Sequence, residues 1–415
     1  MSFSIIPCRV SSLLTPVFLA AALVTGCSDG NITDPNRPVR IVRATDVEQL
    51  YAAANDPANA GAIIMLAAGK YMLSVNNAAG VARPNGGRLD LQQDMWLSGV
   101  ENDRTAVTID GTALTVASFK MPFGRTGVVR IGRGKNGVEW LTIAGNPLAA
   151  ASIETDLGTS ADASGRVAHV SAGNSSRGID VRNVGAANAG RDLHVDMEDN
   201  EFFRGAEGIR VANFVDAHGG RISVEMHGNR SYENILGCII ENNKTNSATI
   251  QVFSTGDRFE DNGLGCEIGG GVSGGPGVAN NNFTLFEAQG TQFTNNRRTV
   301  FFNTTGPNFT EFGGVRVIGG QASPPTTYTS GNSVFVRLVD CPVSDNQNVN
   351  FQAYGGLSAD APPIALFPKR DPFQIVGPAN HATVELHGVS KQIVVEGTAS
   401  SPVDPSGSNT LTILR

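Results

Sequence analysis

A six-residue pattern recurs four times in the middle of the chain, and it constrains the fold more than any other feature of the sequence. Each copy begins with Gly and then alternates apolar and polar residues; the copies are 178–183, 208–213, 237–242 and 265–270. They begin 30, 29 and 28 residues apart. A repeat of this length predicts a solenoid, in which each repeat buries its apolar face against its neighbours.

A second alternating segment keeps the same interval. Its copies are 193–198, 222–227 and 250–255. Alternation with period two is typical of a strand that buries one face. We therefore predict parallel strands whose equivalent residues form inward columns. These columns are Ile179, Ile209, Cys238 and Cys266; Val181, Val211, Ile240 and Ile268; Leu193, Ile222 and Ile250; and Val195, Val224 and Val252.

Two cysteines, Cys238 and Cys266, fall in one inward column. The rung spacing predicts a Cα separation of about 4.8 Å, which lies within the disulfide range of about 4.4–6.8 Å. A disulfide and a pair of stacked, buried thiols are both compatible with the sequence.

The first folded segment combines a short helix with a buried strand. Thr45 and Glu48 have the spacing of a capping box, which predicts a helix that begins there. An apolar strand follows at 62–66, and a Gly-x-Tyr turn closes it at 69–71. This helix, strand and turn resemble the N-terminal cap of right-handed parallel β-helix proteins, the pectin-lyase-like group.

The resemblance implies an all-β chain, a right-handed parallel β-helix solenoid over residues 41–360 with a short N-terminal capping helix. Residues 361–415 hold further strand-like pieces, which we expect to cap the C-terminal end of the solenoid. In proteins of this group stacked Asn side chains bond to one another at turns, and Asn200 and Asn229 fit that role. The LxxLxL pattern of leucine-rich repeats, the competing solenoid, is missing.

The N-terminus resembles a lipoprotein signal. Residues 1–26 contain an apolar run from 10 to 24, which suits a secretory signal better than a membrane span. The run ends in LVTGC, which is similar to the lipobox of bacterial lipoproteins; the alternative is an ordinary secretory signal. The resemblance implies a lipid on Cys27, and Ser28 after it implies sorting to the outer membrane. We expect a tether over 27–40 and a lipid-anchored protein of the cell envelope, on its periplasmic or surface face.

The charge balance excludes one class of partner. The chain has 31 Lys and Arg against 38 Asp and Glu, a formal net charge of −7. A nucleic-acid binder usually has a basic profile, so we expect no nucleic-acid partner. We expect a monomer whose membrane contact is the N-terminal lipid.

Outward residues of the second strand segment form one candidate site. His194 and Asp196 alternate outward on one rung, and Glu225 and His227 do so on the next. Two carboxylates about 4.8 Å apart, Asp196 and Glu225, repel each other, which raises one pKa or attracts a cation. We predict Asp196, Glu225 and His227 as catalytic residues, His194 as a ligand contact, and Asp196 and Glu225 as ligands of a Ca²⁺ ion; the alternative is a solvated polar face. No cofactor is certain from the sequence.

Outward residues of the first strand segment form a second candidate site. Asp180, Arg182, Arg210 and Glu241 are predicted to face solvent and to contact a sugar ligand, with Arg210 on its carboxylate. Because Arg210 is one rung from Asp180, a ladder of salt bridges is the alternative interpretation.

The resemblance covers architecture rather than catalytic motifs. Many members act on polysaccharides, but the Asn-Thr-Asp, Asp-Asp and Gly-His-Gly motifs of the galacturonan hydrolases are missing, as is the Arg-x-Pro-x-x-Arg motif of the pectate lyases. Fold alone does not confer function. Three hypotheses remain: a polysaccharide-binding envelope lipoprotein, a divergent polysaccharide lyase or hydrolase, and a structural or adhesive envelope protein. Exposed aromatic residues favour binding, and Phe253 and Tyr232 are the candidates.

Overall fold

The computed structural model describes residues 40–121, 124–155, 161–273, 278–296, 313–322, 329–346, 351–357, 380–389, 395–398 and 410–414. They belong to one compact unit that begins at Pro38. The expected signal peptide and Cys27 lie outside the described residues, as does the expected tether apart from Arg40.

Three parallel sheets account for most of the described residues, and each is built from strands far apart in sequence. Sheet A contains β1 (Arg40–Ala44), β2 (Ala62–Leu66), β5 (Trp96–Ser98), β10 (Gly134–Glu139), β13 (Ala163–Ala168), β16 (Asp192–Glu198), β19 (Arg221–His227), β22 (Thr249–Thr255), β26 (Phe283–Gln289), β30 (Ser333–Val339), β33 (His381–His387) and β35 (Thr410–Leu414). Sheet B contains β3 (Gly69–Met72), β6 (Val107–Asp110), β11 (Thr142–Ala144), β14 (Ser171–Gly173), β17 (Glu201–Phe203), β20 (Arg230–Tyr232), β23 (Arg258–Glu260), β27 (Gln292–Thr294) and β31 (Val343–Ser344).

The third sheet, sheet C, contains β4 (Leu89–Asp90), β9 (Val129–Arg130), β12 (Ile153–Glu154), β15 (Arg177–Val184), β18 (Glu207–Phe214), β21 (Leu236–Asn243), β24 (Leu264–Ser273), β28 (Gly313–Ala322), β32 (Phe351–Leu357) and β34 (Val395–Thr398). Two short pairs lie beside the sheets: β25 (Ala279–Asn280) with β29 (Thr329–Ser330), and β7 (Lys120–Met121) with β8 (Gly124–Arg125). Short 3₁₀ turns are Pro57–Asn59, Pro84–Gly87, Val116–Phe119 and Ala186–Asn188.

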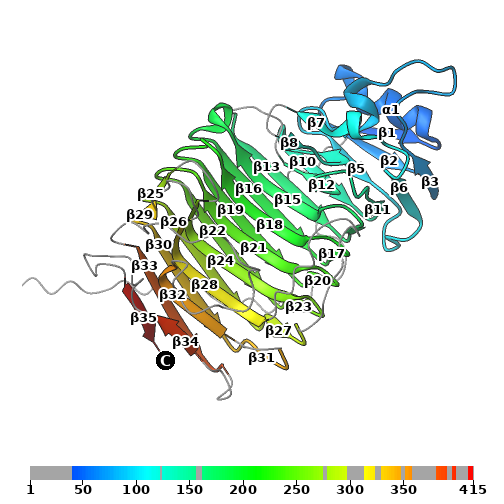
Figure 1. The fold of residues 1–415 in the computed structure, drawn as a ribbon. Coiled ribbons are helices and arrows are strands. Elements are labelled where there is room, and N and C mark those ends of the chain that lie inside the picture. The colour runs from blue at the N-terminus through cyan, green and yellow to red at the C-terminus, as the bar shows by residue number, and fades with distance from the viewer. Residues whose placement is uncertain are drawn as a thin grey trace, which may run out of the picture. The chain divides into compact units, whose positions relative to one another are not determined.

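From β4 to β31, each repeat contributes one strand to each of the three sheets, in the order C, A, B. The strands β15, β16 and β17 come from one repeat and pair with β18, β19 and β20 of the next. All pairings within the three sheets are parallel. Figure 1 shows these strands stacked side by side in chain order. The chain is therefore a right-handed parallel β-helix, as the repeat and the resemblance predicted.

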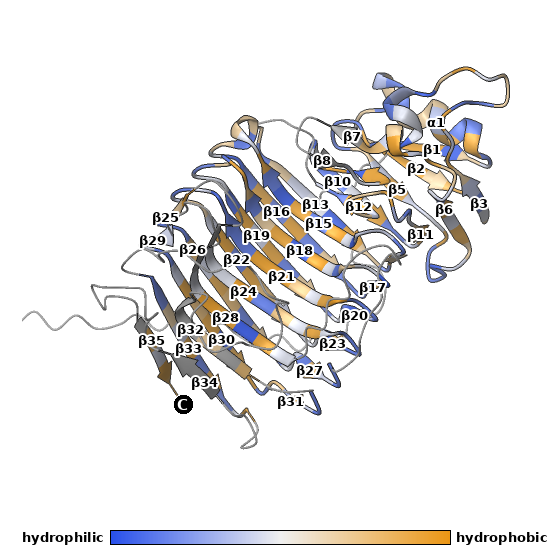
Figure 2. Cartoon of the chain, viewed as in Figure 1, coloured by the Kyte–Doolittle hydropathy of each residue, from blue (hydrophilic) through white to orange (hydrophobic). Residues whose placement is uncertain are grey.

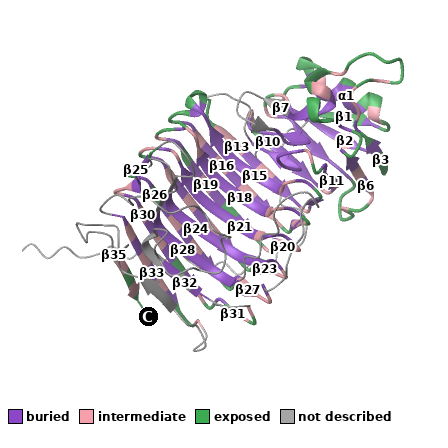
Figure 3. Cartoon of the chain, in the orientation of Figure 1, coloured by how far each residue is buried: buried purple, intermediate pink, exposed green. Residues whose placement is uncertain are grey.

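The predicted inward columns form the core. Ile179, Ile209, Cys238 and Cys266 occupy equivalent positions on successive strands of sheet C, and all are buried. Figure 2 shows apolar and polar residues alternating along the strands, and Figure 3 shows that exposed residues gather at turns and around the N-terminal helix. The two cysteines are free thiols, so the stacked-thiol alternative holds.

The N-terminal helix α1 (Val47–Asn55) begins one residue later than the capping-box prediction required. Asp46 is the N-cap, and its side chain accepts a hydrogen bond from the backbone N–H of Gln49 at 2.8 Å. The expected cap, Thr45, instead contacts the Gln49 side chain at 3.1 Å. The prediction was wrong because Asp46 is an equally good cap and its carboxylate lies at the N-terminal end of the helix, where negative charge is favoured.

Buried Asn side chains join the rungs at their turns. The predicted pair is confirmed: the Asn200 amide donates to Asn229 at 2.8 Å, and Asn229 donates to Asp257 at 2.9 Å. Three further ladders run through Asn234, Asn262, Asn296 and Asn346, through Asn282, Asn332 and Asn380, and through Asn183, Asn213 and Asn242. Each ladder satisfies buried polar groups that the turns would otherwise leave unpaired.

The strands after residue 380 extend the sheets. β33 and β35 continue sheet A, and β34 continues sheet C, at the end where capping strands were expected. In the described part of the chain, we find no helix that is both long and apolar enough to span a membrane.

Candidate functional site

The candidate site lies on the outer face of sheet A, where polar side chains alternate with the buried columns. One outward column crosses five neighbouring strands, from β10 to β22; its members are Lys135, Ser164, His194, Ser223 and Gln251. Parallel strands lie about 4.8 Å apart, so the column presents one polar side chain at each step along the helix axis. These residues line a groove of about 590 Å³ formed by the N-terminal halves of the strands.

Charged side chains that line the groove already bind other groups of the protein. Arg221 donates from Nε and Nη2 to the two carboxylate oxygens of Asp192, each at 2.5 Å. The hydrogen bond to Asp192 and its charge raise the pKa of the Arg221 guanidinium. One rung earlier, Asp162 accepts a hydrogen bond from the backbone N–H of Asp192 at 2.9 Å. At the first rung Asp94 accepts one from the backbone N–H of Lys135 at 2.7 Å.

Neutral hydrogen-bonding groups lie between these charges. Ser164, Ser223 and Gln251 are half-buried and line the groove. Within the described residues, their side chains form no hydrogen bond to the protein. Two hydroxyls and one amide are therefore available to a ligand.

The predicted catalytic residues lie beside this column on the same face. Asp196 and Glu225 occupy equivalent positions on β16 and β19, and His227 lies opposite Glu198 two residues further along. His194 Nε2 is 2.8 Å from Asp196 Oδ1, and this hydrogen bond raises the pKa of the imidazole. The structure thus brings His194, Asp196 and Glu225 together, while their predicted catalytic and ligand-binding roles stay predictions.

A second hollow of about 330 Å³ lies on the same face, toward the C-terminal ends of β22, β26 and β30. Phe253 lines it and follows Gln251 of the first groove by two residues on β22, so outward residues of one strand line both hollows. Glu287 is opposite Phe253 in the register, and Arg337 is opposite Glu287. Phe253 is half-buried, so part of its ring is accessible, as expected for an outward aromatic.

The predicted calcium ligands are two carboxylates on adjacent rungs. Asp196 already accepts the hydrogen bond from His194, and Glu225 is exposed. Calcium takes six to eight oxygen ligands, so these two carboxylates would supply only part of a site.

Among the described residues, another set of side chains is better placed to bind a metal ion. The ligand atoms of His169, Glu198 and Asp199 all lie within 4.8 Å of one another. The His169 ring stacks on Trp140 with its centroid 3.8 Å away, and burial lowers the pKa of the imidazole. Because Arg166 binds the Glu198 carboxylate, this set is also satisfied as an ion-pair cluster without a metal.

The sugar contacts predicted on the first strand segment are not on an open surface. Asp180, Arg182, Arg210 and Glu241 are 0%, 8%, 5% and 7% exposed, so the expectation that they face solvent was wrong. They face away from the apolar core but pair with charges from adjacent rungs. Arg210 Nη2, for example, donates to Glu241 Oε1 at 2.8 Å, and Arg182 Nη2 lies 2.5 Å from Glu154 Oε1. The alternative interpretation, a ladder of salt bridges, describes these contacts, and the ligand-binding role stays a prediction.

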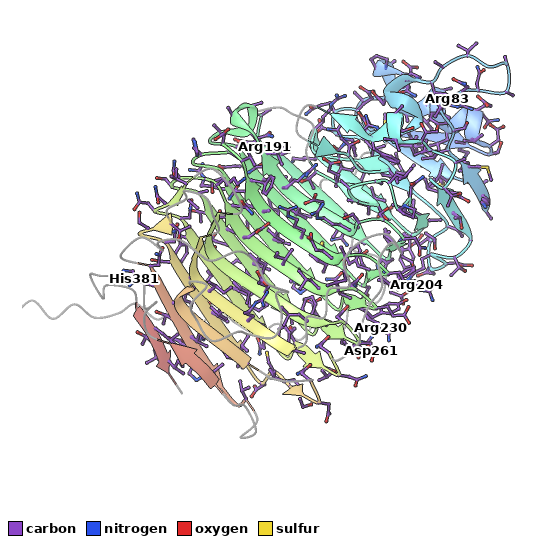
Figure 4. All side chains as sticks on the ribbon, in the orientation of Figure 1. Arg83, Arg191, Arg204, Arg230, Asp261 and His381 are labelled. Atoms are coloured by element: carbon purple, nitrogen blue, oxygen red, sulfur yellow. The ribbon has the colours of Figure 1, made fainter. Side chains whose placement is uncertain are left out.

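Sequence reasoning missed Arg191, which is fully buried at the margin of the solenoid (Figure 4). Its Nη2 donates to the carbonyl of Gly132 at 2.9 Å, and its Nε donates to that of Ala161 at 3.0 Å. The residue therefore joins three turns. Because it occurs once and outside the alternating segments, no sequence pattern identifies this role.

Tyr232, the other expected aromatic, belongs to a stacked set on sheet B. Its ring lies 5.4 Å from that of Phe203, and the Arg230 guanidinium lies 4.2 Å from the Tyr232 centroid. Figure 4 shows Arg204 and Arg230 along the same margin of the solenoid. Since Phe203 and Arg230 already contact this ring, Tyr232 is a weaker sugar platform than Phe253.

Comparisons with known proteins identify no family for the chain. No protein-family model and no curated protein matches the sequence. It is similar to the A-module of the Azotobacter vinelandii mannuronan C-5 epimerase AlgE4, with 14% identity and a TM-score of 0.39 over 89% of this chain and 90% of that one. For the A-module of AlgE6 from the same organism, the identity is 14% and the TM-score 0.34, over 88% of this chain and 92% of that one. The parallel β-helix rests on the strand pairing of this chain itself.

Proposed function

We propose that this protein is a cell-envelope lipoprotein that binds a linear polysaccharide along the outer face of sheet A without cleaving it. The observation that carries the proposal is the polar column from Lys135 to Gln251 above a groove of about 590 Å³. An extended polymer lying along the helix axis would meet a polar side chain at every rung, about 4.8 Å apart. Sugar hydroxyls both donate and accept hydrogen bonds, as do the hydroxyl and amide groups of this column.

The adjoining hollow supplies the apolar part of such a site. Binding sites for small polar ligands combine a few directed polar groups with apolar or aromatic surface. Phe253 offers that surface two residues from Gln251. One sugar ring of a bound chain would pack on Phe253 while its neighbours bond to the column.

A retention assay tests the proposal. Residues 28–415, without the lipid, are run through gels that contain neutral or acidic polysaccharides, with Ca²⁺ or with EDTA. We expect slower migration in at least one gel, and neither new reducing ends nor unsaturated-uronate absorbance in solution. If no polysaccharide retards the protein, the rigid-spacer hypothesis replaces this one.

A matched pair of variants locates the site. Phe253→Ala should weaken retention roughly tenfold, because the stacking surface of the ring is lost. Phe203 is a half-buried phenylalanine of β17 on sheet B and lines neither hollow, so Phe203→Ala is the control and should leave retention unchanged. Equal loss in the two variants would exclude the second hollow from the site.

A divergent lyase is the second candidate, and one observation favours it. The hydrogen bond between His194 and Asp196, with Glu225 on the next rung, places a histidine and two carboxylates together, the residue types of general acid–base catalysis. If the protein cleaves a polysaccharide, Asp196→Ala should abolish product formation while the thermal unfolding temperature stays within a few degrees of that of the wild type. An unchanged rate would remove this assignment.

The proposed lipid anchor has its own test. A Cys27→Ser variant of the full chain should leave the membrane fraction for the soluble envelope fraction, because one lipid-bearing cysteine is the proposed attachment. Mass spectrometry of the mature wild-type N-terminus should find acyl chains on Cys27. An unmodified N-terminus, or a different first residue, would support the ordinary secretory signal.

A further inference from the structure

We propose that the groove on sheet A selects an uncharged polysaccharide and disfavours an acidic one. This inference rests on the proposed function and names its ligand class. It follows from two features of the lining: where its charges are, and which polar groups they leave available.

The lining has an excess of negative charge. Its fixed charges are the carboxylates of Asp94, Asp162 and Asp192 and the cations of Lys135 and Arg221. His194 also lines the groove, and its imidazole is paired with the Asp196 carboxylate. Beside the groove on the same face are Asp196 and the exposed Glu225, with the cation of Arg166 opposite Asp196. An anionic polymer in the groove would therefore approach more carboxylates than cations, and like charges brought together cost free energy.

The guanidinium best suited to an acidic sugar is already occupied. Bidentate pairing with a carboxylate is the arrangement by which Arg recognises a uronate. Arg221 makes both of these hydrogen bonds to Asp192. A uronate would have to displace that carboxylate, which lies on the adjacent strand. Asp192 thus acts against an acidic ligand.

The groups that remain available are neutral. The hydroxyls of Ser164 and Ser223 and the amide of Gln251 line the same groove and form no hydrogen bond within the described residues. Each can donate and accept, which suits sugar hydroxyls. Ser164 and Ser223 flank His194 on the rungs before and after it, so the three positions would contact consecutive parts of one chain.

The test compares three polymers with residues 28–415: a soluble neutral glucan, polygalacturonate and deacetylated chitosan. We expect the tightest retention on the neutral glucan and little change when the salt concentration is raised about tenfold, because no net charge is neutralised on binding. Stronger retention on polygalacturonate or on chitosan would overturn the inference and leave the proposed function standing. Retention on none of the three would count against the proposed function itself.

Two variants assign the selectivity to the groove. Ser164→Ala combined with Ser223→Ala should weaken retention on the neutral glucan roughly tenfold, since two hydrogen bonds are lost. Thr383→Ala is the control, because Thr383 is half-buried further along the same outward face and lines neither hollow. Unchanged retention in the double variant, with its unfolding temperature preserved, would overturn the inference.

Asp192→Asn directly tests whether the Asp192 carboxylate keeps an acidic ligand from Arg221. With the carboxylate gone, Arg221 is free to bind a uronate, so retention on polygalacturonate should rise roughly tenfold and should fall again with salt. No gain on polygalacturonate would mean that the Arg221–Asp192 pair does not control the ligand charge.

Discussion

At the scale of single residues, Asp257 stands where the two preceding rungs have Asn200 and Asn229. Its Oδ1 accepts hydrogen bonds from the backbone N–H and the side-chain amide of Asn229 at 2.7 and 2.9 Å, and its Oδ2 accepts one from Ser254 at 2.6 Å. Burial raises its pKa to about 6 despite these bonds. The ladder thus ends on a carboxylate that the fold would hold more easily if it were neutral.

We predict that Asp257→Asn stabilises the protein at neutral pH. Because the pKa in the folded state is about 6 against 3.8 ordinarily, the folded state binds the proton more tightly than the unfolded state. The charged form therefore destabilises the fold above about pH 6, and this cost disappears as the pH falls toward 4. Urea unfolding should show the variant more stable by about 1 to 3 kcal/mol at pH 7, with the difference vanishing near pH 4.

The control for this prediction is Asp216→Asn, at an exposed position. It should leave the stability unchanged at both pH values. If Asp257→Asn is less stable than the wild type at both pH values, the three hydrogen bonds to the carboxylate outweigh the cost of its burial.

The candidate site could be predicted in part at this scale. The period-two alternation places Asp196 and Glu225 on adjacent rungs of the outer face, and the structure agrees. It does not reveal that Asp192 binds Arg221, because a contact between side chains on two strands depends on their rotamers as well as on the register.

At the scale of elements, the glycine that opens each hexad marks where one rung closely approaches the next. A Cβ built on Gly237 would lie 2.5 Å from the carbonyl oxygen of Gly265 and 2.7 Å from the amide of Asn262. The contact at Gly265 is with backbone, which cannot easily move. The Asn ladder and the turn of the next repeat therefore leave no space for a side chain at the first position of this hexad.

We predict that Gly237→Ala destabilises the fold by about 3 kcal/mol or more, because the methyl group forces apart two rungs that are joined by hydrogen bonds. Gly256 provides the comparison: its φ is +64°, and nothing lies within 4 Å of a Cβ there. Gly256→Ala should cost only about 1 to 2 kcal/mol, the strain of a left-handed alanine. Equal losses in thermal unfolding would show that the approach at Gly237 relaxes easily.

The strands differ in how well the sequence predicts them. Strands of six to eight residues, such as β16 and β18, show clear alternation and were predicted. The strands of sheet B are too short for a period to appear; β17, for example, contains Glu201–Phe203 alone. The helix start was missed by one residue because Thr45 and Asp46 are both suitable caps.

At the scale of the whole molecule, charged residues on sheet C form a buried row along the solenoid. Its members, all less than 9% exposed, are Asp90, Arg130, Glu154, Asp180, Arg182, Arg210, Glu241, Glu267 and Arg316. Burial alone would raise the pKa of Asp180, but the arginines around it, Arg182 first, hold it below its ordinary value. The sequence predicts the outward direction of these side chains but not their burial, because alternation reports only which face of a strand is apolar.

The buried row predicts that substitutions of paired charges on neighbouring rungs have strongly non-additive effects on stability. Arg210→Met and Glu241→Met should each destabilise the fold by about 3 to 5 kcal/mol, because each leaves its partner charged and buried. The double variant should lose far less than the sum, since it removes both charges and keeps apolar volume in their place. The surface pair of exposed Arg204 and half-buried Glu233 is the control and should show little coupling in urea unfolding. Additive losses at Arg210 and Glu241 would mean that water, not the partner, stabilises each charge, and the sheet C face would then be open to a ligand after all.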